Sequence, residues 1–120
     1  MTGHIEIGKQ GEAIAVEYLQ NKGYIILEQN WRNHHQEIDI IATKENELVI
    51  AEVKCRSGTL LAEPYTAVNR NKQNLLIKAA NAYIQKKNIN METRFDIVSI
   101  TLGKETIIDH IENAFYPRIR

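Results

Sequence analysis

A chain of 120 residues has the length of one ordinary domain, with room for a full hydrophobic core but not for a second unit. Its apolar fraction of 43% and charged fraction of 25% are typical of a globular protein and exclude a disordered chain. No apolar run approaches the roughly 20 residues of a membrane span, and the N-terminus lacks the layout of a signal peptide. The single cysteine excludes an internal disulfide or a cysteine-rich zinc site, so we expect a cytoplasmic protein that is not bound to a membrane.

The net charge is zero, but the charges are unevenly distributed along the chain. Residues 1–53 contain 4 Lys and Arg against 9 Asp and Glu, whereas residues 54–94 contain 8 against 2. An acidic segment followed by a basic one is what a carboxylate site beside a phosphate-attracting rim would need. Two solvated faces of opposite charge would give the same distribution, so a phosphate-binding site and plain solvated surfaces both stay open as interpretations.

The predicted elements follow one another with little linker between them. In chain order they are a helix at 5–22, strands at 24–32, 37–43 and 48–55, a helix at 71–87, a strand at 94–101 and an extended segment at 106–111. Gly23 is a typical stop for the first helix, and Pro64 is well placed to begin a helix after a loop. The order α-β-β-β-α-β, with one further strand, predicts a single α/β (α+β) domain over residues 1–120, in which helices flank a mixed sheet.

Four charged residues fall in the second and third predicted strands, where burying a charge without a partner or a metal is expensive. Because side chains alternate along a strand, Glu52 and Lys54 share one face, about 7 Å apart. In the second strand, the face of Glu37, Asp39 and Ile41 lies opposite that of Ile38, Ile40 and Ala42. If the turn at 44–47 closes a hairpin, Asp39 and Glu52 lie on the same side of neighbouring strands, and Lys54 lies beside them.

Glu12 is the one acidic side chain on the predicted sheet-facing side of the first helix. At about 100° per residue, it falls inside an arc formed by Ile7, Gly8, Gly11, Ile14, Ala15, Tyr18 and Leu19. This position predicts a third carboxylate near Asp39 and Glu52. A partly exposed glutamate at the edge of the arc would show the same pattern.

The second predicted helix brings basic residues toward the same edge of the sheet. Its buried stripe is predicted to contain Leu75, Leu76, Ala79, Ala80, Tyr83 and Ile84. Lys72 extends this stripe toward the helix N-terminus. Lys72 and Gln73 can therefore reach a site at the sheet edge, where the helix N-terminus itself favours phosphate. A lysine that passes the core to reach water would have the same spacing.

Asp39, Glu52 and Lys54 together indicate metal-dependent phosphate chemistry. Carboxylates on a rigid sheet suit Mg²⁺ or Mn²⁺, which polarise phosphate oxygens and acidify a bound water. A lysine can orient that water or stabilise the charge that develops on the phosphate. The spacing D-x12-E-x-K is weak as a string, and it gains specificity when the three residues face one way on adjacent strands.

Several further motifs carry a resemblance to a known family. They are G-x-x-G-E-x-x-A at 8–15, N-W-R at 30–32, E-I-D at 37–39, E-V-K-x-R at 52–56, K-Q at 72–73 and R-F-D at 94–96. With this order and spacing the chain resembles the PD-(D/E)XK nuclease superfamily. More closely, it is similar to the YraN-type family of predicted bacterial endonucleases, which is related to archaeal Holliday-junction resolvases. Gln36 departs from the glycine usual in that family, and Ile38 stands where the superfamily name expects proline.

The resemblance implies a restriction-endonuclease-like core and an endonuclease that hydrolyses DNA phosphodiester bonds, with branched or single-stranded DNA suggested by the resolvases. It implies that Asp39 and Glu52 bind Mg²⁺ or Mn²⁺, that Glu12 completes the acidic cluster, and that Lys54 assists the attacking water. The residues expected to contact nucleic acid are Arg32, Arg56, Lys72 and Gln73. Cutting at two positions would require a homodimer.

Two alternatives stay open at this point. The first is a catalytically silent module that binds nucleic acid or a protein on the same fold. The second is a set of structural ion pairs in which Lys54 neutralises Glu52, although buried pairs add little stability relative to apolar residues. Arg94 and Asp96 are predicted to form a structural pair, and Trp31 is predicted to pack at the edge of the core.

Overall fold

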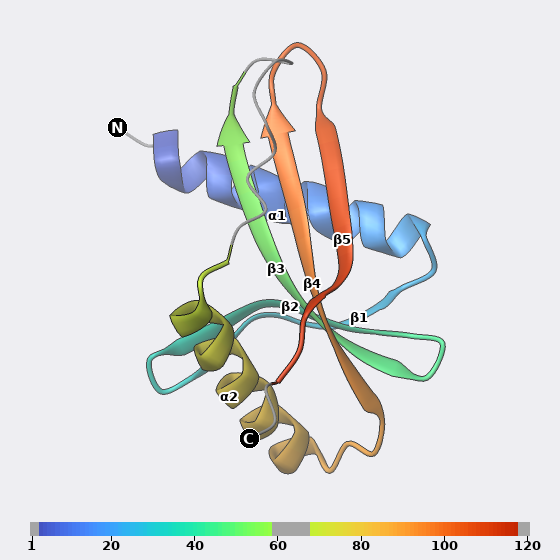
Figure 1. Ribbon diagram of the computed structural model, residues 1–120. Helices are drawn as coiled ribbons and strands as arrows, with labels where there is room; N and C mark the ends of the chain where they lie inside the picture. The colour runs from blue at the N-terminus through green and yellow to red at the C-terminus, as the bar shows by residue number, and fades with distance from the viewer. Residues whose placement is uncertain (1–2, 59–67, 118–120) are drawn as a thin grey trace.

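The computed structural model describes residues 3–58 and 68–117, which form two helices and five strands (Figure 1). In chain order these are α1 (Gly3–Asn21), β1 (Ile25–Asn33), β2 (Gln36–Lys44), β3 (Glu47–Ser57), α2 (Arg70–Lys87), β4 (Glu92–Leu102) and β5 (Ile107–Phe115). The predicted order of elements is therefore confirmed, with the last extended segment as a full strand. The helix start predicted at Pro64 lies outside the described residues. Within the described ranges, neither helix combines the length and the apolar character needed to cross a membrane.

One five-stranded sheet, in the order β1-β2-β3-β4-β5, runs through the molecule. β3 and β4 are parallel, and the other neighbouring pairs are antiparallel. Parallel neighbours need a crossover connection, and α2 lies in the connection between β3 and β4. The predicted fold class, a mixed α+β sheet flanked by helices, is confirmed.

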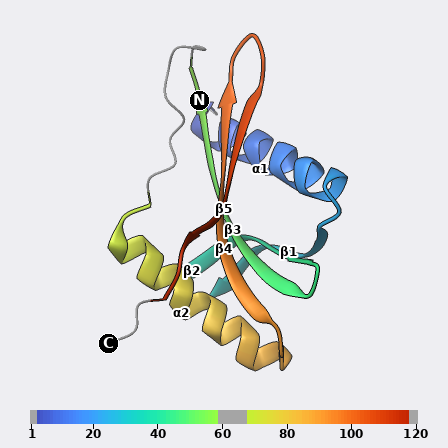
Figure 2. The same cartoon turned by 45° about the vertical axis from the view of Figure 1, so that its right-hand side comes forward.

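The two helices cover opposite faces of the sheet (Figures 1 and 2). The α1-side core joins Ala15 and Leu19 to Tyr24, Ile40, Ala42, Val49, Ala51, Val98 and Ile100. The α2-side core joins Leu76, Ala79, Ala80 and Tyr83 to Ile38, Ile41, Leu48, Ile50, Phe95 and Phe115. Trp31 packs edge-on against Tyr83 with ring centroids 5.2 Å apart, as predicted for the edge of the core. Because both faces are covered, the central strands carry apolar residues on both sides.

A two-residue turn joins β2 to β3. Glu45 and Asn46 both have positive φ, 50° and 71°. Positive φ at both central residues is the requirement of a type I′ turn, whose twist suits a tight hairpin. The predicted hairpin is confirmed. Its ladder ends at the pair Ile40–Ala51, and Asp39 and Glu52 lie one position beyond this pair, on the side away from the turn.

β2 and β3 separate beyond this hairpin and form a fork. Their ladder ends at the pair Ile40–Ala51, whereas β2 continues beside β1, and β3 continues beside β4 to Ser57. Figure 1 shows β1 and β2 turning away from the upper half of β3. Residues 52–57 therefore have no strand neighbour on the β2 side within the described sheet, and Asp39 lies at the opening.

The side-chain pattern of β2 differs from the prediction at the fork. Ile40 and Ala42 pack in the α1-side core as one face, but Ile38 packs with Ile41 in the α2-side core. The strict alternation expected from Ile38 to Ala42 is therefore interrupted at Asp39. This change of face coincides with the point where β2 leaves β3 and keeps only β1 as a neighbour.

Candidate functional site

Asp39 bridges the two strands where their backbones part. Its Oδ2 atom accepts a hydrogen bond from the backbone N–H of Val53, on the free edge of β3, at 2.8 Å. The side chain thus satisfies a backbone donor that the β2 ladder no longer reaches. This bond holds the carboxylate at a defined position beside β3.

The surroundings of Asp39 disfavour its negative charge. Burial, reinforced by the charge of Glu52 and to a smaller extent by that of Glu12, raises the pKa of the Asp39 carboxyl from 3.8 to about 7. The hydrogen bond from Val53 opposes this rise without cancelling it. A carboxyl perturbed by burial and by neighbouring like charges is typical of functional sites.

Glu52 is the second member of this acidic pair and is 7% exposed. Its Oε2 atom lies 4.0 Å from Nζ of Lys54, two residues further along β3. The same oxygen lies 3.7 Å from Nζ of Lys72, in the first turn of α2. Both contacts are longer than hydrogen bonds and act through charge. Lys72 therefore reaches the sheet edge from α2, as its position in the helix predicted.

A hollow of about 300 Å³ opens beside Asp39 of the acidic pair. Its walls come from α1 (Ile7, Gly8 and Glu12), β2 (Asp39) and β3 (Val53, Lys54 and Cys55). Glu12 thus lines the same hollow as Asp39 and Lys54. In the described part of the chain, no three His, Cys, Asp or Glu side chains lie close enough together to form a ready-made metal cluster. The two strand carboxylates form a pair, and Glu12 adds its charge from the helix wall.

Gly11 allows α1 to approach β3 closely enough for Glu12 to line this hollow. A Cβ atom at position 11 would lie 2.4 Å from Cβ and 2.5 Å from Sγ of Cys55, so only glycine fits without a shift of the helix. Cys55 is partly buried and packs against the α1-side core. At Gly8, one turn earlier, nothing lies within 4 Å of such a Cβ atom.

A second hollow, of about 320 Å³, lies between α2 and the end of the β1–β2 hairpin. It is lined by His35, Gln36, Glu37, Lys72, Leu75 and Leu76. Leu75, which was predicted to be buried, is 40% exposed, whereas Leu76 is 2% exposed. Lys72 also contacts Glu52, so this hollow adjoins the acidic pair. Of its lining residues, the sequence marked only Lys72 as a candidate, because the walls come from segments far apart in the chain.

The four residues predicted to contact nucleic acid have different surroundings. The Arg32 side chain is 70% exposed, and its Nη2 atom lies 3.6 Å from Oε1 of Glu37. The Nε and Nη2 atoms of Arg56 are buried and have no hydrogen-bond partner among the described residues. The Gln73 amide donates to a backbone carbonyl just before α2 at 2.8 Å. Of the four, Lys72 is the one with a described contact to the acidic pair.

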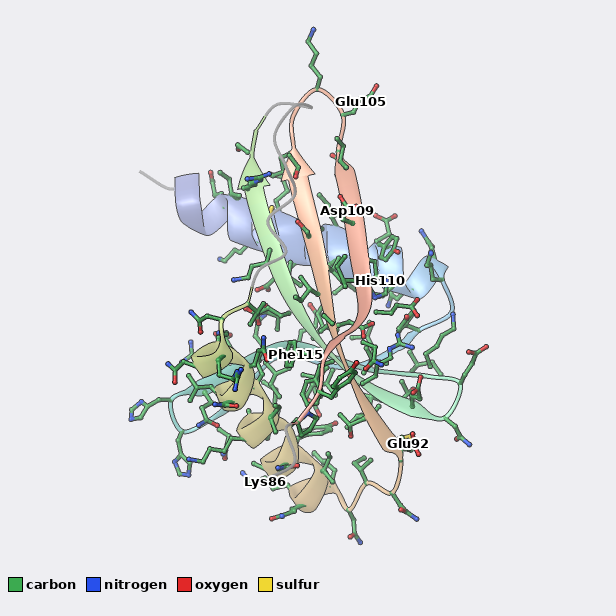
Figure 3. The ribbon with its side chains drawn as sticks, viewed as in Figure 1. Lys86, Glu92, Glu105, Asp109, His110 and Phe115 are labelled. Carbon is green, nitrogen blue, oxygen red and sulfur yellow. The ribbon has the colours of Figure 1, made fainter. Side chains whose placement is uncertain are left out.

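A separate buried cluster surrounds Asp96 of β4. Arg94 donates to both oxygens of Asp96 at 2.9 and 2.8 Å, which confirms the predicted pair. His110, on β5 between the labelled Asp109 and Phe115 in Figure 3, lies 2.7 Å from the same carboxylate, and the backbone N–H of Asn113 donates to it. Burial raises the pKa of Asp96, but hydrogen bonds from His110, Arg94 and Asn113 outweigh burial and hold it below the usual value. His110, which the sequence patterns did not single out, thus belongs to a structural cluster.

Comparison with known proteins agrees with the motifs in this chain. A family model described as "Uncharacterised protein family UPF0102" matches residues 11–100. The chain belongs to this family. UPF0102 proteins of Bacteroides thetaiotaomicron and Flavobacterium psychrophilum are each 49% identical to it, over 118 and 117 residues. The first alignment covers 98% of both chains, and the second covers 97% of this chain and 98% of the relative. A relative from Parabacteroides distasonis is 47% identical over 96% of both chains.

The similarity spans nearly the whole length of the UPF0102 relatives. It therefore confirms the closer resemblance, to the YraN-type family. The names of the family and of these relatives state no activity, so the acidic pair and its neighbours have to support a function through their own chemistry.

Proposed function

We propose that this protein is a metal-dependent endonuclease that hydrolyses phosphodiester bonds of DNA. The observation that carries the proposal is the acidic pair at the fork, where burial and Glu52 raise the pKa of Asp39 to about 7. A pair of like charges costs stability in a sheet that apolar residues would stabilise better. Its presence at the fork, with Glu52 beside two lysines, is accounted for if it binds a cation and acts on a phosphate.

The acidic pair suits a hard divalent cation such as Mg²⁺ or Mn²⁺. Mg²⁺ commonly uses one or two protein carboxylates and fills its other positions with water and substrate phosphate oxygens. A pair is therefore sufficient, and a ready-made cluster of three acids is not required. When bound, the cation would supply the charge that polarises a phosphate oxygen and acidifies the attacking water.

Each residue at the fork has a role in this proposal. Asp39, in its ionised form, and Glu52 hold the cation. Lys54, at the wall of the first hollow, orients the attacking water or stabilises charge on the phosphate. Lys72 is 42% exposed and offers its ammonium to a neighbouring phosphate. Glu12 adds a third negative charge on the α1 side of the hollow.

The exposed face of α2 supports a nucleic acid, rather than a small phosphoester, as the substrate. This helix contains five basic residues and no acidic one. An exposed stripe follows the helix at spacings of three and four residues and consists of Arg70, Asn74, Lys78, Asn81 and Gln85. Cations and amides without carboxylates are the side chains that contact nucleic-acid phosphates and sugars.

A catalytically silent nucleic-acid-binding module is the second candidate, because the α2 stripe would serve it equally well. The two candidates differ in their use of the acidic pair. A binding module gains nothing from two carboxylates beside the phosphate, since like charges repel. A nuclease requires them.

Titration calorimetry with Mg²⁺ and Mn²⁺ distinguishes these candidates. The proteins compared are wild type, Asp39→Asn and, as a matched control, Asp109→Asn on β5. The titration is repeated with a non-cleavable phosphorothioate DNA present, because substrate oxygens complete the coordination of Mg²⁺. We expect binding in wild type and in Asp109→Asn, and loss of binding in Asp39→Asn.

Cleavage of labelled single-stranded, duplex and branched DNA then tests the reaction itself. We expect metal-dependent cleavage by wild type and none by Asp39→Asn, which still binds the DNA because a repelling charge has been removed. Absence of metal binding in wild type, with and without DNA, would overturn the nuclease and leave the binding module.

A further inference from the structure

We propose that the second hollow, between α2 and the β1–β2 hairpin, takes the unpaired base of a nucleotide next to the cleaved phosphate. The proposal rests on the nuclease function and refines it, because it makes nucleic acid with a single-stranded stretch the substrate class. Its starting point is the position of the hollow. Lys72 lines it and also lies 3.7 Å from Glu52 of the acidic pair. A nucleotide with its phosphate at the acidic pair would therefore have its base within reach of the hollow.

The size and floor of the hollow suit a planar apolar group. Its volume of about 320 Å³ lies at the lower end of the range for small-ligand pockets, about 300–1,000 Å³. The apolar part of its lining, here called the leucine floor, consists of Leu76, which is 2% exposed, and Leu75, which is 40% exposed. A 40% exposed leucine beside a buried one leaves apolar surface in water that the face of a base would cover.

The polar part of the lining, here called the polar rim, suits the edges of a base. Gln36 offers both a donor and an acceptor, the Glu37 carboxylate accepts, and His35 contributes a ring nitrogen of either kind. The charge of Glu37 is offset by Arg32, whose Nη2 atom lies 3.6 Å away. The rim therefore offers hydrogen bonds without an unbalanced negative charge that would repel the phosphate.

Entry of a base into this hollow requires that the base be unpaired. In a duplex, the base faces are stacked and the pairing edges are occupied, so neither the leucine floor nor the polar rim could be used. Proteins that read single-stranded nucleic acid contact just these exposed faces and edges. The hollow thus favours a single-stranded end, loop or junction over a continuous duplex.

The matched variants Leu75→Ser and Ile111→Ser test the proposal, since these side chains are 40% and 39% exposed and lie on α2 and β5. The probe is a short single-stranded DNA whose binding is measured by fluorescence anisotropy. It is compared with a series of the same DNA in which each member lacks the base at one different position. Thermal unfolding confirms that both variants are folded. We expect Leu75→Ser to weaken binding by about five- to a hundredfold, the range for losing one base contact, and Ile111→Ser to leave it unchanged.

Loss of the base that enters the hollow should weaken DNA binding by wild type by a similar factor. The same loss should weaken binding by Leu75→Ser only slightly. Equal effects of the two serine variants, or equal binding of intact and abasic strands at every position, would overturn the base site. Cleavage of single-stranded DNA that is unaffected by Leu75→Ser would also overturn the base site, while the nuclease proposal would stand. The expected binding pattern without cleavage of any DNA would keep the base site and overturn the nuclease.

Discussion

Asp39 and Glu52 occupy the first positions beyond the last paired residues of β2 and β3, so the fork in the sheet places two carboxylates side by side. The Asp39 carboxylate accepts the backbone N–H of Val53, and the Glu52 carboxylate lies between Lys54 and Lys72. The two strands separate at these charged residues, and the separation leaves space for a ligand beside the carboxylates. Asp39 is thus held in place by one bond while its charge is disfavoured by burial and by Glu52.

Asp39→Asn should stabilise the protein at pH 8. The native pKa of about 7 exceeds the ordinary value of 3.8, so the native state binds a proton more tightly than the unfolded state. Stability is therefore lost as pH rises from about 4 to about 7. Removing the ionisable group should recover on the order of 2–4 kcal/mol at pH 8 and almost nothing at pH 4. Urea unfolding of wild type and variant at both pH values measures the difference, with Asp109→Asn as the control. Lower stability of Asp39→Asn at pH 8 would instead indicate a structural ion pair.

Metal affinity should rise with pH up to about 7 and then level off. A cation at the acidic pair requires ionised Asp39, whose pKa is about 7, so binding displaces one proton below that pH. The apparent dissociation constant for Mn²⁺ should fall by about tenfold per pH unit between pH 5 and 6.5. Calorimetry in two buffers of different ionisation enthalpy would count the released proton. A dissociation constant that does not change over this range would place the cation away from Asp39.

Gly11→Ala and Gly8→Ala should have opposite effects on stability, although both place alanine in α1. A Cβ atom at Gly11 meets Cys55 at 2.4 Å, whereas at Gly8 it meets nothing within 4 Å. We expect a loss of about 1–3 kcal/mol for Gly11→Ala from overpacking and a gain of up to about 1 kcal/mol for Gly8→Ala from helix propensity. Denaturant unfolding measures both. A stabilising Gly11→Ala would show that α1 can move away from β3 at no cost.

Lys78→Gln should weaken DNA binding and reduce its salt dependence. Lys78 lies in the exposed α2 stripe, whereas Lys104, equally a surface lysine, lies in the turn between β4 and β5 and provides the control. Each phosphate contact contributes about 0.7–0.9 to the slope of log affinity against log salt. The slope should therefore fall by this amount in Lys78→Gln and stay constant in Lys104→Gln. Equal slopes in the two variants would mean that DNA does not follow α2.

Asp96→Asn should destabilise the protein, in contrast to Asp39→Asn. The Asp96 side chain is fully buried and pairs with Arg94 and His110, and removing one member of such a cluster costs about 3–5 kcal/mol. The pKa of Asp96 is lowered, so this stabilisation is present at neutral pH and is lost as pH falls below the ordinary value near 4. Unfolding at pH 7 measures the loss. Metal affinity of the folded fraction should be unchanged, and a change would link the two clusters.

Local patterns in the sequence were sufficient for the elements and for the acidic pair. The periodicities of the segments, Gly23 after the first helix and the turn at Glu45–Asn46 depend only on neighbouring residues. The register of a tight hairpin follows from its turn, so the approach of Asp39 to Glu52 could be predicted from spacing alone. The position of Glu12 on the sheet-facing side of α1 followed in the same way from the helical repeat.

The tertiary contacts of these residues were determined only by the packing of the whole fold. The fork interrupts the alternation of β2 at Asp39, because the neighbours of β2 change there, and local sequence rules do not predict that change. The second hollow exists because α2 packs against a hairpin tip far away in the chain, which leaves Leu75 exposed. His110 meets Asp96 for the same kind of reason, through pairing of β5 with β4. Spacing along the chain determines which face a side chain takes, whereas its partner is determined by packing between distant segments.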